Sequence, residues 1–154
     1  MSSISSINNE INSCRNKISQ NNKIIDECVN SHDSLNLFKR SVEESKEEHF
    51  QNAKDIKSIV QELNPLTEEC ITAKRYMDGM EDTVSGIGYN IVGVAYTTLI
   101  ASVNIKLAAY RTQIKLKEVE NNVLEGRIRN LEMKKDAIRA AERAAEAMKN
   151  LLTD

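Results

Sequence analysis

Four glutamates in the first half of the chain have the spacing of a carboxylate metal site. Glu43 and Glu47, and likewise Glu44 and Glu48, stand four residues apart, which places both carboxylates of a pair on one face of a helix. A di-iron centre in a four-helix protein uses such carboxylates, but it also needs Glu-x-x-His motifs on facing helices. The C-terminal half holds no copy of that motif. We therefore predict a solvated acidic face and no metal.

The histidines and cysteines are too far apart to act together. His32 and His49 are 17 residues apart, roughly 25 Å along one helix, so they cannot share a metal within one chain. Cys14 and Cys28 are 14 residues apart, roughly 21 Å, well beyond the reach of a disulfide. With Cys70 the cysteine count is odd. We expect all three to be small buried hydrophobic residues in the reduced form.

No other motif indicates catalysis. The sequence lacks His-Glu-x-x-His and Cys-x-x-Cys, and Gly86-Ile87-Gly88 lacks the third glycine and the lysine of a nucleotide loop. With a net charge of −2, the chain is not basic enough overall to suggest nucleic acid as its partner. We predict a protein that is not an enzyme, has no cofactor and binds no nucleic acid.

The elements that carry these residues are predicted to be helices. One proline, five glycines and 4 % aromatic residues exclude a β-sandwich or barrel. Residues 4–63 follow a heptad spacing with a weak middle stretch, in which the four positions His32, Lys39, Lys46 and His49 are polar. We expect Phe38 and Phe50 to take over the packing there. The apolar seam positions are Ile4, Ile7, Ile11, Cys14, Ile18, Ile25, Cys28, Leu35, Val42, Ala53, Ile56, Val60 and Leu63.

Two breaks divide the rest of the chain. Asn64-Pro65 ends the first helix, and a short helix follows over about 66–84, with one face made by Leu66, Cys70, Ala73, Met77 and Met80 or Val84. The glycines of 85–88 predict a kink, and a long helix runs over about 89–152. The fold class is all-α: a single domain, 1–154, forming an elongated antiparallel helical hairpin or coiled coil. The seam of the last helix is Leu107, Tyr110, Ile114, Lys117, Asn121, Leu124, Ile128, Leu131, Lys135 and Ile138.

Two asparagines occupy seam positions that a heptad usually fills with apolar residues. Such residues fix register or partner choice at some cost in stability. If the hairpin folds near residue 77, Asn21 faces about residue 133, so we expect that it does not pair with Asn121. Each asparagine then either pairs with another chain or is solvated at a loosely packed point.

The run from Thr83 to Ile105 contains no charged residue. Its 23 residues are long enough to cross a bilayer, but its serines, threonines and two asparagines favour a soluble helix, so we predict no stable membrane insertion. A helix that is apolar nearly all round must be covered. A hairpin offers one partner helix, so we expect another chain to cover part of this surface. The small residues Gly93, Thr97, Ala101 and Ala108 would let its backbone approach closely.

The layout resembles a known family. An Ile-rich heptad helix, the Leu63–Thr67 break Leu-Asn-Pro-Leu-Thr, a central helix with glycine in Tyr76-Met77-Asp78-Gly79, and a C-terminal coiled helix are similar to YwqH-like accessory proteins. Genes for these proteins lie beside those for LXG-domain toxins of the Gram-positive type VII secretion system. They are distant relatives of the WXG-type helical hairpins.

The resemblance implies a non-catalytic targeting factor. It would bind the N-terminal helical LXG domain of a cognate toxin, with a second small accessory protein as a further partner, in a hetero-oligomer. No aromatic residue has an aspartate four positions later, so the export signal would come from another subunit. The candidate partner-binding residues are Leu35, Phe38, Phe50, Ile91, Gly93, Val94, Thr97, Ala101, Ile105 and Ala108.

Two other functions remain open on this sequence. A membrane-active subunit, similar to those of helical pore-forming toxins, would also have long amphipathic helices around an apolar segment. A homomeric coiled-coil scaffold would self-associate without any partner. The N-terminus has no basic and apolar regions of a cleaved signal peptide, so we expect a cytoplasmic protein, with export by another route left open.

Overall fold

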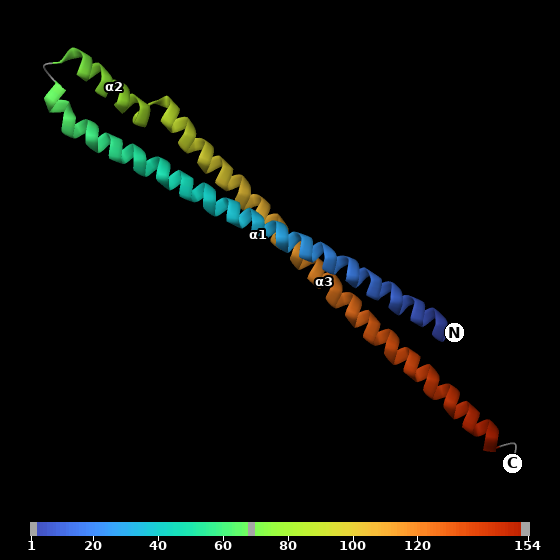
Figure 1. Cartoon of the computed structure of the whole chain (residues 1–154). Helices are drawn as coiled ribbons and strands as arrows, with labels where there is room; N and C mark the ends of the chain where they lie inside the picture. The colour runs from blue at the N-terminus through green and yellow to red at the C-terminus, as the bar shows by residue number, and fades with distance from the viewer. Residues whose placement is uncertain (1–2, 68–69, 152–154) are drawn as a thin grey trace. The chain divides into compact units, whose positions relative to one another are not determined.

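The computed structural model describes residues 3–67 and 70–151, and the regular structure in these residues is entirely helical. Helix α1 spans Ile4–Leu63, the 3-10 turn η1 spans Asn64–Thr67, α2 spans Ile71–Ser85 and α3 spans Ile87–Leu151 (Figure 1). The chain is therefore an all-α helical hairpin, which confirms the predicted fold class. Contacts divide it into two compact units, residues 1–31 with 110–154 and residues 32–109.

The buried residues of α1 all lie on the predicted heptad seam. They are Ile7, Ile11, Cys14, Asn21, Cys28, Val42, Ala53 and Val60. The polar seam positions His32, Lys39, Lys46 and His49 are half-buried on the same face. The expectation that Phe38 replaces them is wrong, because its side chain is 48 % exposed. An unbroken helix keeps its period through polar positions, and lysine can cover apolar surface with its stem.

The first unit is built by the start of α1 and the C-terminal part of α3. Its core is Ile7 and Ile11 against Leu131, with Ile128 and Ile138 packed around them. Two ion pairs flank this core: Glu10 accepts from Arg127 at 3.1 Å and Glu132 accepts from Arg15 at 3.3 Å. From the Ile11 and Leu131 contact to the hydrogen bond between Asn21 and Asn121, residue numbers rise along α1 and fall along α3, so the helices pack antiparallel here. They do so through the seams that the sequence predicts for 4–28 and 107–138.

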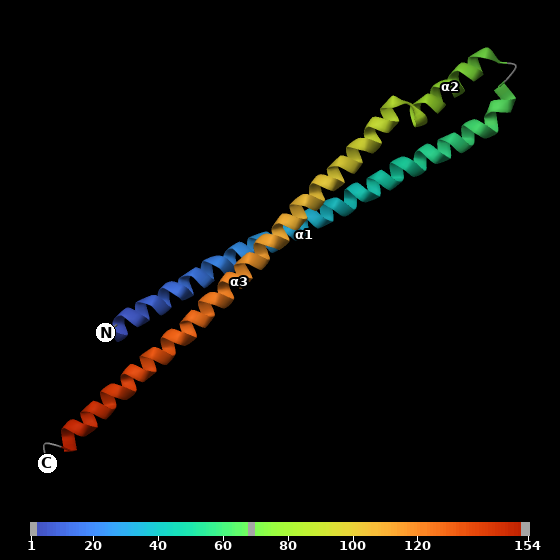
Figure 2. The ribbon, with the colours of Figure 1, turned by 180° about the vertical axis from the view of Figure 1, so that it is seen from behind.

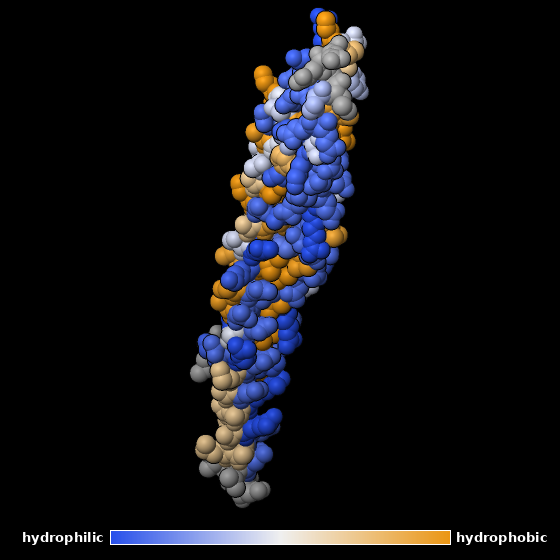
Figure 3. All heavy atoms as spheres, turned by 90° about the vertical axis from the view of Figure 1, so that its left-hand side faces the viewer, coloured by the Kyte–Doolittle hydropathy of each residue, from blue (hydrophilic) through white to orange (hydrophobic). Residues whose placement is uncertain are grey.

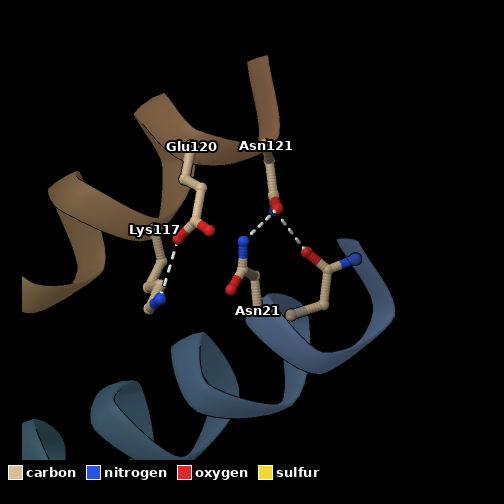
Figure 4. A network of polar contacts seen from close by, with 5 residues as sticks. Asn21, Lys117, Glu120 and Asn121 are labelled. Carbon is tan, nitrogen blue, oxygen red and sulfur yellow. Dashed lines mark hydrogen bonds and ion pairs between the residues drawn. The ribbon is translucent and has the colours of Figure 1, made fainter. Parts of the chain in front are cut away.

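The two seam asparagines meet inside this unit. Asn21 Nδ2 donates to Asn121 Oδ1 at 2.9 Å, and Asn121 Nδ2 donates to Asn22 Oδ1 at 2.8 Å (Figure 4). The expectation that they do not pair is wrong. It assumed a reversal near residue 77, whereas the chain reverses between α1 and α2, and the midpoint of 21 and 121 is residue 71.

The second unit contains residues 32–63 of α1, all of α2 and the start of α3. α2 buries Met77 and Val84, and α3 buries Val103 and Leu107. Met77 and Val84 are seven residues apart and Val103 and Leu107 are four apart, so α2 and α3 each present one apolar side within this unit. Figures 1 and 2 show the change of direction between α2 and α3 from opposite sides.

The segment between α1 and α2, where the chain reverses, is longer than the sequence predicts. The helix after Asn64-Pro65 begins at Ile71 and not at 66, since η1 occupies 64–67. Cys70 is the N-cap of α2, with extended backbone angles of φ −122° and ψ 102°. It is exposed, so the prediction of three buried cysteines holds for Cys14 and Cys28 only. Residues 68–69 lie outside the described residues, as do the side chains of Leu66 and Thr67.

Gly86 makes the predicted kink between α2 and α3. Its N–H donates to the Asp82 carbonyl at 2.6 Å, and its backbone is extended at φ −74° and ψ −175°. A Cβ at this position would collide with the same Asp82 carbonyl oxygen. α3 begins at Ile87, two residues before the predicted start, because Asn90 N–H already donates to the Gly86 carbonyl at 3.2 Å. The break therefore depends on the absence of a side chain at 86.

Candidate partner-binding surface

One side of α3 carries an exposed apolar stripe along the uncharged run. Ile91, Val94 and Ile105 are 62 %, 64 % and 72 % exposed. We call this surface the outer stripe; its members, spaced four and three residues apart, are Ile87, Ile91, Val94, Thr98, Ala101 and Ile105. Intervals of four and three keep all six on one side of the helix. The outer stripe is a continuous surface that this chain leaves uncovered among its described residues.

The same stretch of α3 also has an inner apolar side. Val103, only 5 % exposed, and Leu107 belong to the hairpin core, whereas Val94 and Ile105 point away from it. The hairpin itself therefore covers only one side of this stretch of helix. Only 11 % of the most apolar 18-residue window is buried. Figure 3 shows apolar residues gathered along one edge of the molecule, beside a face that is mostly polar.

A groove on the second unit joins four of the predicted binding residues. Phe50 of α1 and Gly93, Val94 and Thr97 of α3 line it together. Its volume is about 440 Å³, and its remaining walls are Lys46, Tyr89, Asn90 and Thr98. Because Val94 and Thr98 also belong to the outer stripe, the groove and the stripe form one continuous candidate surface.

The predicted small residues do not share one face. Gly93 packs against the Phe50 ring, so it faces α1. Thr97 Oγ1 donates to the Gly93 carbonyl at 3.0 Å and accepts from Lys46 Nζ at 3.4 Å. Ala101 and Ala108 are exposed on α3. At 100° per residue, the eight residues from 93 to 101 turn the side-chain direction by about 80°. The close approach at Gly93 therefore serves the hairpin itself.

The remaining predicted residues lie outside the groove. Leu35 is half-buried at a seam position of α1, and Phe38 is exposed on the same helix. Neither lines the groove beside Phe50. Ile105 is exposed at the far end of the outer stripe. Seven of the ten predicted residues thus lie in the groove or the outer stripe, and three lie outside both: Leu35 and Phe38 on α1 and Ala108 on α3.

Sequence reasoning missed an aromatic cluster beside the groove. The His49 ring stacks on Tyr89 at 4.8 Å between centroids, and Phe50 meets Tyr89 edge-on at 5.6 Å. Tyr96 lies 6.0 Å from His49. Lys46 lies over the Phe50 ring and Lys57 over the Tyr89 ring, each at 5.9 Å. The spacing of the tyrosines could have indicated this cluster, because Tyr89 and Tyr96 are seven residues apart and therefore lie on one side of α3.

The outer stripe consists mainly of apolar side chains. Within residues 3–67 and 70–151, no histidines, cysteines or carboxylates gather in threes to hold a metal ion. His49 Nε2 is buried without a hydrogen-bond partner in the described part of the chain, within the aromatic cluster. No protein-family model, curated protein or solved structure matches this sequence. The surface must therefore be interpreted from its own residues.

Proposed function

We propose that this protein works by binding a helical partner along the outer stripe and the adjoining groove of α3. The observation that carries the proposal is the exposure of Ile91, Val94 and Ile105 in a run without charge. Burying such side chains contributes roughly 25 cal/mol per Å² of apolar surface removed from water. A contiguous apolar surface of this kind is typical of a protein interaction site.

The proposed partner is the N-terminal helical LXG domain of a cognate type VII toxin. The resemblance of the layout to YwqH-like accessory proteins supports this choice, and so does the geometry of the surface. A helix presents its own stripe at intervals of three and four residues, which fits the spacing of the outer stripe. On this proposal the complex forms in the cytosol and holds the toxin's apolar surface covered until export.

The test is co-purification of an LXG domain whose gene lies next to that of this protein, using the variant Ala101→Glu. Ala101 is an exposed member of the outer stripe, so the glutamate is solvated in the free chain. In the complex it would be stranded away from water, which costs several kcal/mol. Glutamate is a good helix former, so α3 should persist. We expect unchanged circular dichroism and loss of the partner.

The matched control is Ala145→Glu, the same change at an exposed position of α3 outside the outer stripe. It should bind the partner as the parent chain does. Full partner occupancy with Ala101→Glu would exclude the outer stripe as the binding surface. If the parent chain binds no LXG domain, the proposed partner is wrong.

One observation favours a second candidate, a membrane-active helical protein. The helical stretch Ile71–Asn150 contains a window long and apolar enough to cross a membrane, and most of that window is exposed. Asn90 and Asn104 within the run would need hydrogen-bond partners in lipid. Co-sedimentation of the purified chain with vesicles distinguishes the two: the membrane candidate requires Ala101→Glu to abolish vesicle binding, whereas the binding-protein proposal expects no vesicle binding at all.

A further inference from the structure

The spacing of the residues in the outer stripe is the same from either end of the stripe. From Ile87 to Ile105 the intervals between its members are four, three, four, three and four residues. Two copies laid antiparallel with their centres together therefore place every member opposite another. The pairs are Ile87 with Ile105, Ile91 with Ala101 and Val94 with Thr98. Ile91 with Ala101 sets a large side chain against a small one, as interdigitating helices require, and Val94 meets Thr98, a side chain of the same shape.

The charges at the two ends of the uncharged run have opposite signs. The last three charged residues before it, Asp78, Glu81 and Asp82, are acidic. The next four after it, Lys106, Arg111, Lys115 and Lys117, are basic. In an antiparallel pair the basic end of one copy lies beside the acidic end of the other. A parallel pair would instead set like charges together, which is unfavourable.

From this self-complementarity we propose that a second copy of this chain covers the outer stripe when no other partner is bound. The contact is isologous: two α3 helices cross antiparallel about a twofold axis near residue 96. The middle of the stripe is uncharged, so the pair brings no like charges together at its centre. Because the outer stripe is also the surface proposed for the partner, the second copy and the partner exclude one another, and partner binding dissociates the pair.

The test is the mass of the purified chain over a range of concentrations by sedimentation velocity. We expect a concentration-dependent species of twice the mass of one chain. Ile91→Glu should raise its dissociation constant at least tenfold, because a charge enters the apolar contact. Lys106→Glu should raise it about threefold to tenfold, because Lys106 follows Ile105, and the Ile87 that opposes Ile105 in the second copy lines one groove with Asp82. Lys54→Glu, an exposed change on α1, is the control and should have no effect.

The double variant Lys106→Glu with Asp82→Lys tests the orientation. In the antiparallel pair each new lysine lies near a new glutamate, so the double variant should dimerise better than Lys106→Glu alone. A chain that stays monomeric throughout overturns the inference, and so does a dimer that Ile91→Glu leaves intact or that the second change fails to restore. Neither outcome touches the partner proposal, whose measurement is capture of the LXG domain.

Discussion

Asn21 Nδ2 donates to Asn121 Oδ1 at 2.9 Å across the two helices of the hairpin, at a position where both heptad seams are otherwise mostly apolar. Asn21 is only 5 % exposed. A shift of either helix by one turn would break the hydrogen bond between the two amides and put Asn121 opposite Ile18 or Ile25. The pair therefore favours one register over its neighbours, the role that polar seam residues have in coiled coils.

The asparagine pair predicts opposite effects of single and double substitutions. Asn21→Leu leaves the Asn121 carbonyl oxygen without its donor, and should lower the free energy of unfolding by about 1–3 kcal/mol. The double variant Asn21→Leu with Asn121→Leu replaces both amides with packed apolar groups and should be at least as stable as the parent. Urea denaturation measures both. If the double variant is weaker than the single one, the amide pair stabilises the fold instead of selecting its register.

Next to the asparagine pair, the carboxyl group of Glu120 has a lowered pKa. Lys117 donates to Glu120 at 2.8 Å and lowers the pKa of that carboxyl, with a smaller contribution in the same direction from a hydrogen bond to Asn21 (Figure 4). Since the pKa is lower in the folded chain, the stabilisation is present above the ordinary glutamate pKa and is lost as the pH falls through the folded value. Lys117→Met should raise the Glu120 pKa in an NMR titration, and Asn21→Ala should raise it less. Equal pKa values in all three chains would contradict the assignment.

Two glycines of the second unit should respond to alanine with opposite signs. Gly79 lies within α2 with open space around the site of a Cβ, so Gly79→Ala should stabilise the chain by about 0.5–1 kcal/mol through helix propensity. At Gly86 the Cβ would meet the Asp82 carbonyl oxygen, so Gly86→Ala must distort the kink and should destabilise. Thermal melts of the two variants provide the comparison. Stabilisation by both would show that the kink does not need glycine.

The exposures of the three cysteines predict thiol reactivity. Cys70 is exposed at the start of α2, whereas Cys14 and Cys28 are buried on the α1 seam. A thiol reagent should modify one cysteine rapidly in the native chain and all three in denaturant. Cys70→Ser should remove the rapid phase and leave the slow one. Rapid modification of two or three thiols in the native chain would contradict the packing of α1.

The seam positions follow from helical periodicity and could be predicted from the sequence. The register between the two helices depends on where the chain reverses, and it was not predicted correctly. Heptad spacing placed Ile11 and Leu131 on the inner seams, because an uninterrupted helix preserves its phase over many turns. The pairing of Asn21 with Asn121 was missed, because register depends on the exact point of reversal and an error of six residues there shifts the partner by twelve. Composition marked the uncharged run, but only the structure separates Val94 from Val103.

Those two valines test the two-sided character of α3 directly. Val103 is 5 % exposed and Val94 is 64 % exposed, so one aspartate would enter the hairpin core and the other would enter water. Val103→Asp should lower the free energy of unfolding by several kcal/mol, because a carboxylate is then buried without a partner. Val94→Asp should change it by less than about 1 kcal/mol, the range of ordinary surface substitutions, yet abolish association through the outer stripe. Urea denaturation measures the first difference and sedimentation the second. Equal destabilisation by the two changes would mean that Val94 belongs to the core of this chain, and that the outer stripe is not free to bind a partner.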